Sequence, residues 1–159
     1  MENTNEILNG IVNQSIKNVI CVDDDFLEPY EDVMETNKEK CIFSRQMYSA
    51  ISSSCECAVT IIPYKQETDV KIINDKMRQK DLLILDWELT EVADIKKAIE
   101  IIDGALTNNV QYICIYTNTH NLTGICETLR LYYCGFSKSE VTYLSLIHIS
   151  EPTRRSYIS

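Results

Sequence analysis

Four short apolar segments, separated by stretches of helical periodicity, constrain the fold of this chain more than any other feature. They predict strands at about 18–22, 58–62, 81–86 and 110–116. Short apolar runs bounded by polar residues are typical of strands that are buried in a parallel sheet. Strands that alternate with helices indicate βαβ units, whose right-handed crossovers restrict the topology to doubly wound forms.

The stretches between these segments carry apolar residues at steps of three and four, as an amphipathic helix does. Helices are expected at 42–51, 69–79, 94–106 and 122–133. A similar pattern from Ile7 to Ile16 predicts an additional helix at 1–16, before the first strand. The prediction is therefore an α/β fold with a doubly wound parallel sheet of flavodoxin-like strand order 2-1-3-4-5, preceded by an extra helix.

The end of the chain differs in character from the rest. Residues 145–154 read SLIHISEPTR, which resembles the translation of sequencing-adapter read-through at the end of metagenomic reading frames. We therefore expect an N-terminal helix at 1–16, one domain at 17–143 and a non-native tail at 144–159. On this interpretation the fifth βα unit is truncated after about Tyr143. The alternative is a genuine strand followed by a polar terminus.

The composition argues against several classes of protein. The formal net charge of −9 disfavours direct binding to nucleic acid, because an acidic chain repels the phosphate backbone. No apolar run reaches the length of about 18 residues that a transmembrane helix needs, so no membrane association is expected. The seven cysteines include no CxxC pair and are odd in number, which argues against a zinc ribbon and a disulfide framework. This usage fits a reducing cytoplasm, and we expect Cys21 and Cys114, inside predicted strands, to be core residues.

Three of the predicted strands run into residues that suit phosphoryl chemistry. Asp23 and Asp24 follow the first strand, Asp86 ends the third, and Thr117 follows the fourth. Ligands of parallel sheets bind beyond the carboxyl ends of the strands, so these residues should share one rim. With strands 1 and 3 as neighbours, the three carboxylates would converge and repel one another unless a cation neutralised them. Mg²⁺ suits such a site, because it is a hard ion that prefers oxygen ligands.

The motifs VDDD at 22–25, LILDW at 83–87 and IYTN at 115–118 together resemble a response-regulator receiver domain. The last two are more similar to the divergent bacterial response receiver domain family than to the standard two-component type. The resemblance covers about residues 16–135. It implies a signalling switch in a phosphorelay or related bacterial system, with a histidine kinase or phosphotransfer protein and an output domain or protein as partners.

The resemblance also implies roles for individual residues. Asp86 would be the phosphoacceptor, and Thr117 would be the switch hydroxyl that follows the phosphoryl group. Asp23, Asp24 and Asp86 would bind Mg²⁺, with the backbone carbonyl of Glu88 as a further ligand. No enzymatic activity is expected beyond Mg²⁺-dependent self-phosphorylation and dephosphorylation of the aspartate.

The chain departs from the receiver pattern at two points. Receivers carry a lysine at the end of the fifth strand, and no residue of this chain matches it. Lys138 follows no strand-like run, and we interpret it as a surface loop residue. Asn118 stands where many receivers have a smaller side chain.

Two other functions remain open from the sequence. A receiver-like module that binds a partner without phosphorylation would fit the missing lysine and Asn118. A phosphatase of the haloacid dehalogenase type would fit the segment from Asp86 to Thr90, which resembles that family's Asp-x-Asp-x-Thr motif. In the phosphatase, however, the second carboxylate would be Glu88, and the acidic cluster after the first strand would have no role.

Overall fold

The computed structural model describes residues 10, 14–27, 38–55, 57–65, 67–89, 95–117 and 122–137. The chain forms two compact units, Met1–Thr117 and Asn118–Ser159. The elements of the first unit are β1 (Asn18–Asp23), α2 (Lys38–Cys55), β2 (Ala58–Pro63), α3 (Val70–Lys76), β3 (Leu82–Asp86), α4 (Ile95–Thr107) and β4 (Tyr112–Tyr116). The described helix of the second unit is α5 (Leu122–Tyr133). In the part of the chain that is described, no helix has the length and apolar character needed to cross a membrane.

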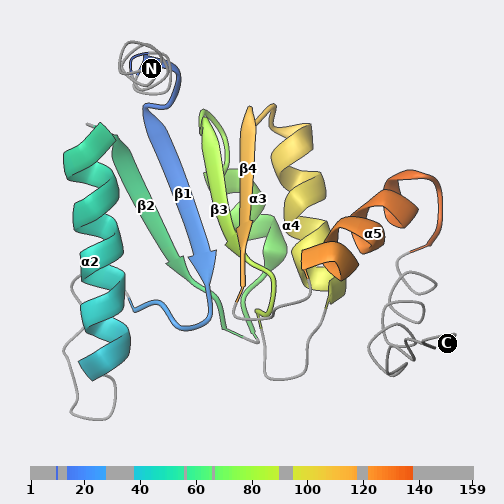
Figure 1. The fold of residues 1–159 in the computed structure, drawn as a ribbon, viewed down its shortest axis with the longest axis horizontal. Helices are drawn as coiled ribbons and strands as arrows, with labels where there is room; N and C mark the ends of the chain where they lie inside the picture. The colour runs from blue at the N-terminus through green and yellow to red at the C-terminus, as the bar shows by residue number, and fades with distance from the viewer. Residues whose placement is uncertain are drawn as a thin grey trace, which may run out of the picture. The chain divides into compact units, whose positions relative to one another are not determined.

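The four strands form one parallel sheet of order β2-β1-β3-β4 (Figure 1). This confirms the predicted doubly wound parallel sheet and the first four positions of its predicted order. Each strand lies within two residues of its expected bounds. The predicted fifth strand, the tail at 144–159 and most of the helix at 1–16 lie outside the described residues.

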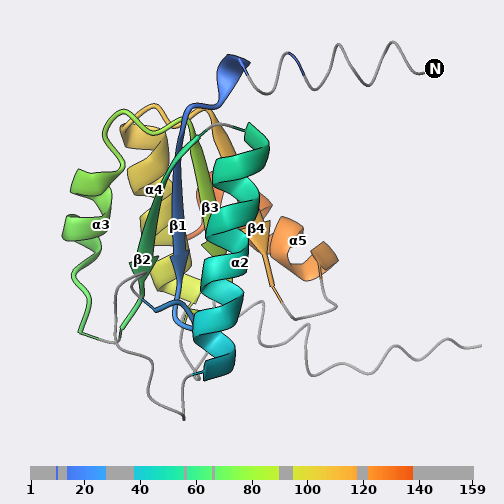
Figure 2. The same cartoon turned by 90° about the vertical axis from the view of Figure 1, so that its left-hand side faces the viewer.

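Helices of the first unit cover the two faces of the sheet. α2 lies against one face, and α3 and α4 lie side by side against the other (Figure 2). α4 buries the stripe that its sequence pattern predicts, formed by Ile95, Ala98, Ile99 and Ile102. β1 is the most deeply buried strand, since every residue after Asn18 is buried. Two neighbouring strands and two helical layers therefore enclose β1, the strand that leads to Asp23 and Asp24.

The face of the sheet under α2 shows one wrong prediction. Cys21 is buried there, as expected, but Cys114 is exposed. The register places Cys21, Ile84 and Cys114 in one row across β1, β3 and β4, on the same face. α2 packs mainly on β2, which is the edge strand at the opposite end of the strand order from β4. An apolar strand pattern predicts a buried residue only where a helix covers that part of the sheet.

At the amino ends of the strands, Asp81 joins three strands. One oxygen of its carboxylate, Oδ2, accepts the backbone N–H groups of Lys17 and Asn18, both at 2.8 Å. Its own N–H donates to the carbonyl of Asn18 at 2.8 Å, and its carbonyl accepts the N–H of Tyr112 at 3.0 Å. Asp81 therefore connects the start of β1 to the starts of β3 and β4.

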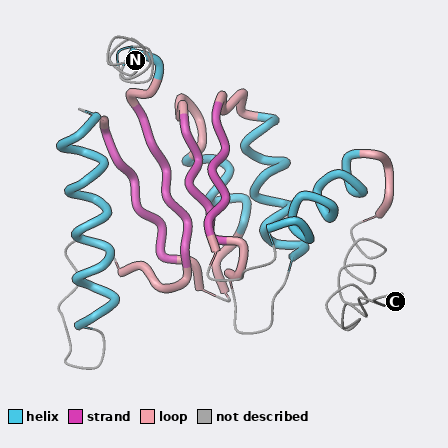
Figure 3. The backbone as a smooth tube through the Cα atoms, in the orientation of Figure 1, coloured by secondary structure: helices cyan, strands magenta, loops and turns pink. Residues whose placement is uncertain are grey.

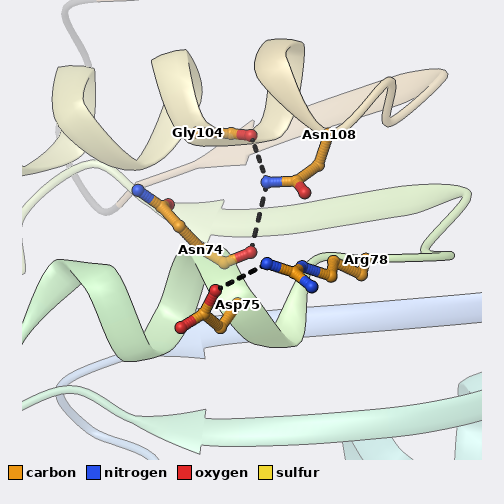
Figure 4. A network of polar contacts seen from close by, with 5 residues as sticks. All are labelled: Asn74, Asp75, Arg78, Gly104 and Asn108. Carbon is orange, nitrogen blue, oxygen red and sulfur yellow. Dashed lines mark hydrogen bonds and ion pairs between the residues drawn. The ribbon is translucent and has the colours of Figure 1, made fainter.

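On the face of the sheet opposite α2, α4 approaches α3 closely at Gly104 (Figure 4). The side-chain amide of Asn108 donates from Nδ2 to the carbonyls of Gly104 at 2.9 Å and Asn74 at 3.1 Å, which bridges the two helices. A Cβ added at Gly104 would overlap the side-chain amide of Asn74. The Oδ1 atom of Asn74 is buried and has no hydrogen-bond partner. A larger residue at position 104 would therefore have to displace the Asn74 amide.

Replacing Asp81 should make stability depend on pH. The N–H groups of Lys17, and next of Asn18, hold the pKa of this carboxyl below its usual range. A lowered pKa adds stability above the ordinary value and loses it as the pH falls through the folded value. We expect Asp81→Ala to lower the free energy of unfolding at neutral pH by about 1 kcal/mol, allowing for solvent screening. Urea unfolding should show that difference shrinking in acid.

The control for this experiment is Asp75→Ala. Asp75, on α3, forms an exposed ion pair with Arg78, which lies just after the end of the helix, so the loss of this pair should change stability little at any pH. Equal stability of Asp81→Ala and the wild type at neutral pH would contradict the assignment of Asp81.

The effect of Gly104→Ala should change sign with the residue at position 74. In the wild type the new methyl group displaces the Asn74 amide, and overpacking of this kind costs about 1–3 kcal/mol. In an Asn74→Ala background the overlap disappears, and the better helix propensity of alanine adds about 1 kcal/mol. A double-mutant cycle by urea unfolding measures both effects. Additive effects of the two substitutions would show that Asn74 does not impose the glycine.

Candidate metal centre at the carboxyl ends of the strands

The register of the sheet sets the positions of the functional side chains. Val22 pairs with Leu85, so Asp23 and Asp86, the next residue on each strand, reach the same edge. Asp86 in turn pairs with Tyr116, the last residue of β4. The loops that follow β1 and β3 leave the sheet at this edge (Figure 3). Parallel pairing therefore forms a shared rim from residues that are far apart in the sequence.

Three carboxylates converge on this rim, as the sequence predicts. One oxygen from each of Asp23, Asp24 and Asp86 lies within 4.8 Å of the others. The side chain of Asp23 is buried, with 2% exposed, whereas Asp24 and Asp86 are half-buried. The site is thus open enough for a ligand but poorly hydrated at its base.

Backbone amides orient two of the carboxylates. The N–H of Asp25 donates to Oδ1 of Asp23 at 2.6 Å, and the N–H of Glu88 donates to Oδ1 of Asp86 at 3.1 Å. In both cases the donor lies two residues after the acceptor, which is the pattern of an Asx turn. Each turn directs the chain away from the sheet directly after the acid. The backbone of Glu88 therefore lies beside the Asp86 carboxylate.

The cluster resists ionisation. Burial, and next the neighbouring carboxylates, chiefly that of Asp86, raise the pKa of Asp23 to about 7, although the N–H of Asp25 acts in the opposite direction. Burial and the charge of Asp24 raise the pKa of Asp86 to about 6, although the N–H of Glu88 lowers it. These are the shifts expected where like charges share a site of low hydration.

This set of groups fits a hard divalent cation. All three side chains offer oxygen, which is the donor that Mg²⁺ prefers, and their combined negative charge favours a cation over water. Mg²⁺ usually binds one or two carboxylates and keeps several waters, so a half-exposed cluster suits it better than a closed cage. The burial of Asp23 gives the site a fixed base.

Two further residues of the sequence motifs, Trp87 and Thr117, lie at the same edge of the sheet. The backbone N–H of Trp87 donates to the carbonyl of Tyr116 at 3.1 Å, which joins the ends of β3 and β4. Thr117 is the next residue after Tyr116, so the register brings it to the same rim as Asp86. Trp87 itself is buried, with 6% exposed, although the sequence gives it only a loop position. Asn118 and Lys138 lie outside the described residues.

Sequence reasoning missed two groups that hold the loop after β1. The N–H of Tyr64 donates to the carbonyl of Asp23 at 2.8 Å, and the Oγ atom of Ser44 accepts the N–H of Leu27 at 3.2 Å. A backbone contact such as that of Tyr64 leaves no mark on the sequence. The serine does leave one, because it stands three residues before Met47 on the side of α2 that packs against the sheet.

Removing one charge from the cluster should stabilise the metal-free fold. A carboxyl whose pKa is raised by folding costs stability when ionised, and that cost is complete above the folded pKa and absent below the ordinary one. Asp23→Asn should therefore raise the free energy of unfolding at neutral pH by about 1–3 kcal/mol. Urea unfolding with a chelator measures the gain, which should diminish near pH 4.

Adding a divalent cation also tests whether the three carboxylates repel one another in the metal-free protein. Mg²⁺ should stabilise the wild type more than Asp23→Asn, so the gap between the two proteins should close or reverse. Asp75→Asn, on the exposed surface of α3, serves as the control for charge alone. A loss of stability in Asp23→Asn under chelation would show that the carboxylates do not repel one another.

Comparison with known proteins agrees with this geometry. Residues 15–155 match the family model described as the response receiver domain, a range that includes β1 to β4 and α2 to α5. No curated protein and no solved structure gives a significant match to the chain. The family match confirms the resemblance carried by the three motifs at the strand ends.

Proposed function

The chain belongs to the response receiver domain family, and from this membership we propose that it is a phosphoacceptor switch, phosphorylated on Asp86 in a Mg²⁺-dependent reaction. The observation that carries the proposal is the convergence of Asp23, Asp24 and Asp86 within 4.8 Å at the ends of β1 and β3. A family fold without these acids would support only a binding module. Here the acids and the fold occur together.

The proposed reaction uses the carboxylate of Asp86 as the nucleophile. One of its oxygens attacks the phosphorus atom of a donor, a new O–P bond forms, and the bond from phosphorus to the leaving group breaks. Mg²⁺ held by Asp23, Asp24, Asp86 and the carbonyl of Glu88 would supply the positive charge that offsets the anionic oxygens. The amide of Glu88, already bonded to Oδ1 of Asp86, orients the attacking group.

Thr117 is the proposed switch residue. A phosphoryl group on Asp86 adds acceptor oxygens to a rim that is already acidic, and hydrogen-bond donors must turn toward it. The hydroxyl of Thr117 stands one residue beyond Tyr116, the partner of Asp86 in the sheet. Its movement would displace the chain that follows β4 and change the surface that partners contact.

The proposed partners and setting follow from the same role. A receiver domain is a signalling component, so a histidine kinase or a phosphotransfer protein would supply the phosphoryl group. A downstream output domain or protein would respond to the switched state. We place the reaction in the cytoplasm of a bacterium, in a phosphorelay or related system.

Labelling by a small acyl phosphate tests the proposal. With Mg²⁺ the wild type should take up one phosphoryl group as a stable acyl phosphate, and a chelator should prevent this. Asp86→Asn should abolish the label, while the control Asp75→Asn, on α3, should be labelled as the wild type is. Intact-mass spectrometry measures all three proteins.

The alternatives give different results in the same experiment. A receiver-like module that only binds a partner would remain unlabelled under all conditions. A phosphatase of the haloacid dehalogenase type would turn over the donor continuously and release inorganic phosphate. Labelling that survives in Asp86→Asn would assign the reaction to another residue.

A further inference from the structure

Asp24 is the one member of the acidic cluster that lies outside the sheet. Asp23 and Asp86 are the last residues of β1 and β3, so the register of the strands fixes their backbones. Asp24 and Asp25 form a bend directly after β1. The position of Asp24 therefore depends on the contacts of this loop and not on strand pairing alone.

Two contacts hold this loop on the side of α2. The side chain of Phe26 is buried, with 1% exposed, in a core cluster that includes Met47 and Ile51 of α2. The N–H of the next residue, Leu27, donates to Oγ of Ser44 at 3.2 Å. One contact is apolar and without direction, whereas the other fixes the orientation of a peptide group.

The hydroxyl of Ser44 is buried among apolar side chains, where it needs a hydrogen-bond partner. Its side chain is 3% exposed, on the face of α2 that carries Met47 and Ile51. Burying a hydroxyl costs free energy unless it is hydrogen-bonded, and an alanine here would avoid that cost. Leu27 lies three residues after Asp24, a length of chain that extends about 10 Å at most. A shift at Leu27 is therefore transmitted to Asp24 over a short path.

We propose that Ser44 is a positioning residue, which fixes the loop from Asp24 to Leu27 so that the Asp24 carboxylate meets those of Asp23 and Asp86 around a divalent cation. The inference rests on the proposed function, since it takes Mg²⁺ as the ligand of the cluster. It assigns control over the affinity of the site to α2, none of whose described side chains belongs to the acidic cluster. Groups that orient metal ligands commonly affect affinity by about ten- to hundredfold.

The test compares two serines of the same helix. Ser44→Ala removes the acceptor of the Leu27 N–H, whereas Ser52→Ala removes a hydroxyl that donates to the carbonyl of Tyr48 at 2.7 Å, within α2 itself. Calorimetric titration of the full chain with MgCl₂ gives the Kd, and urea unfolding under chelation gives the stability of each protein. Hydrogen exchange at the Leu27 amide reports the loop directly.

We expect Ser44→Ala to bind Mg²⁺ about three- to tenfold more weakly than the wild type, a smaller effect than for groups that bond the ligands themselves. The Leu27 amide should exchange faster in this variant, and Ser52→Ala should match the wild type in both respects. If Ser44→Ala does not fold, Ser44→Cys decides the question, because sulfur keeps the size of the side chain but is a weak acceptor.

Three results would overturn the inference. An unchanged Kd in a folded Ser44→Ala or Ser44→Cys protein would show that the hydrogen bond is structural only. Equal weakening in Ser44→Ala and Ser52→Ala would reflect a general effect on α2. A wild type that binds no Mg²⁺ would refute the proposed function and this inference with it, which distinguishes that failure from the other two.

Discussion

The parallel pairing of β1 with β3 is the interaction on which the rest of this molecule depends. It buries the apolar row from Val19 to Val22 against the third strand, and the same register brings the terminal acids Asp23 and Asp86 to one edge. Stability and electrostatic repulsion therefore have a common origin in this register. A site of this kind costs the fold some stability, which functional sites often do.

The pKa values of aspartates at the two ends of the sheet are shifted in opposite directions. At the amino ends, Asp81 meets backbone N–H donors, which favour its charge and lower its pKa. At the carboxyl ends, Asp23 meets burial and other carboxylates, which disfavour its charge and raise its pKa to about 7. The difference follows from the surroundings of each carboxylate, because Asp81 accepts two backbone N–H groups at the starts of the strands, whereas three carboxylates converge at their ends and Asp23 is buried there. One end holds the strands together, and the other end is left able to respond to a ligand.

Sequence reasoning was most reliable where the physics is local or periodic. Apolar runs located the four strands, and the stripe of Ile95, Ala98, Ile99 and Ile102 located α4. The acidic rim was also predictable, because parallel strands must end at a common edge. Cys114 was wrong because its burial depends on which helix covers β4, and that is a property of the tertiary structure. Ser44 was missed because its place on the packed side of α2 indicates burial but does not identify its partner, the Leu27 amide.

The central position of β1 has a consequence for synthesis on the ribosome. This early strand pairs with β2 and β3, and its start bonds to Asp81, which follows Asn18 by 63 residues. At translation rates of about 5–20 residues per second, roughly 3–13 s pass before both neighbours of β1 have been made. During that interval at least one edge of this apolar strand has no partner and is exposed to other nascent chains. β1, which ends at the acidic cluster, is thus also the strand that depends longest on protection by chaperones while the domain is being made.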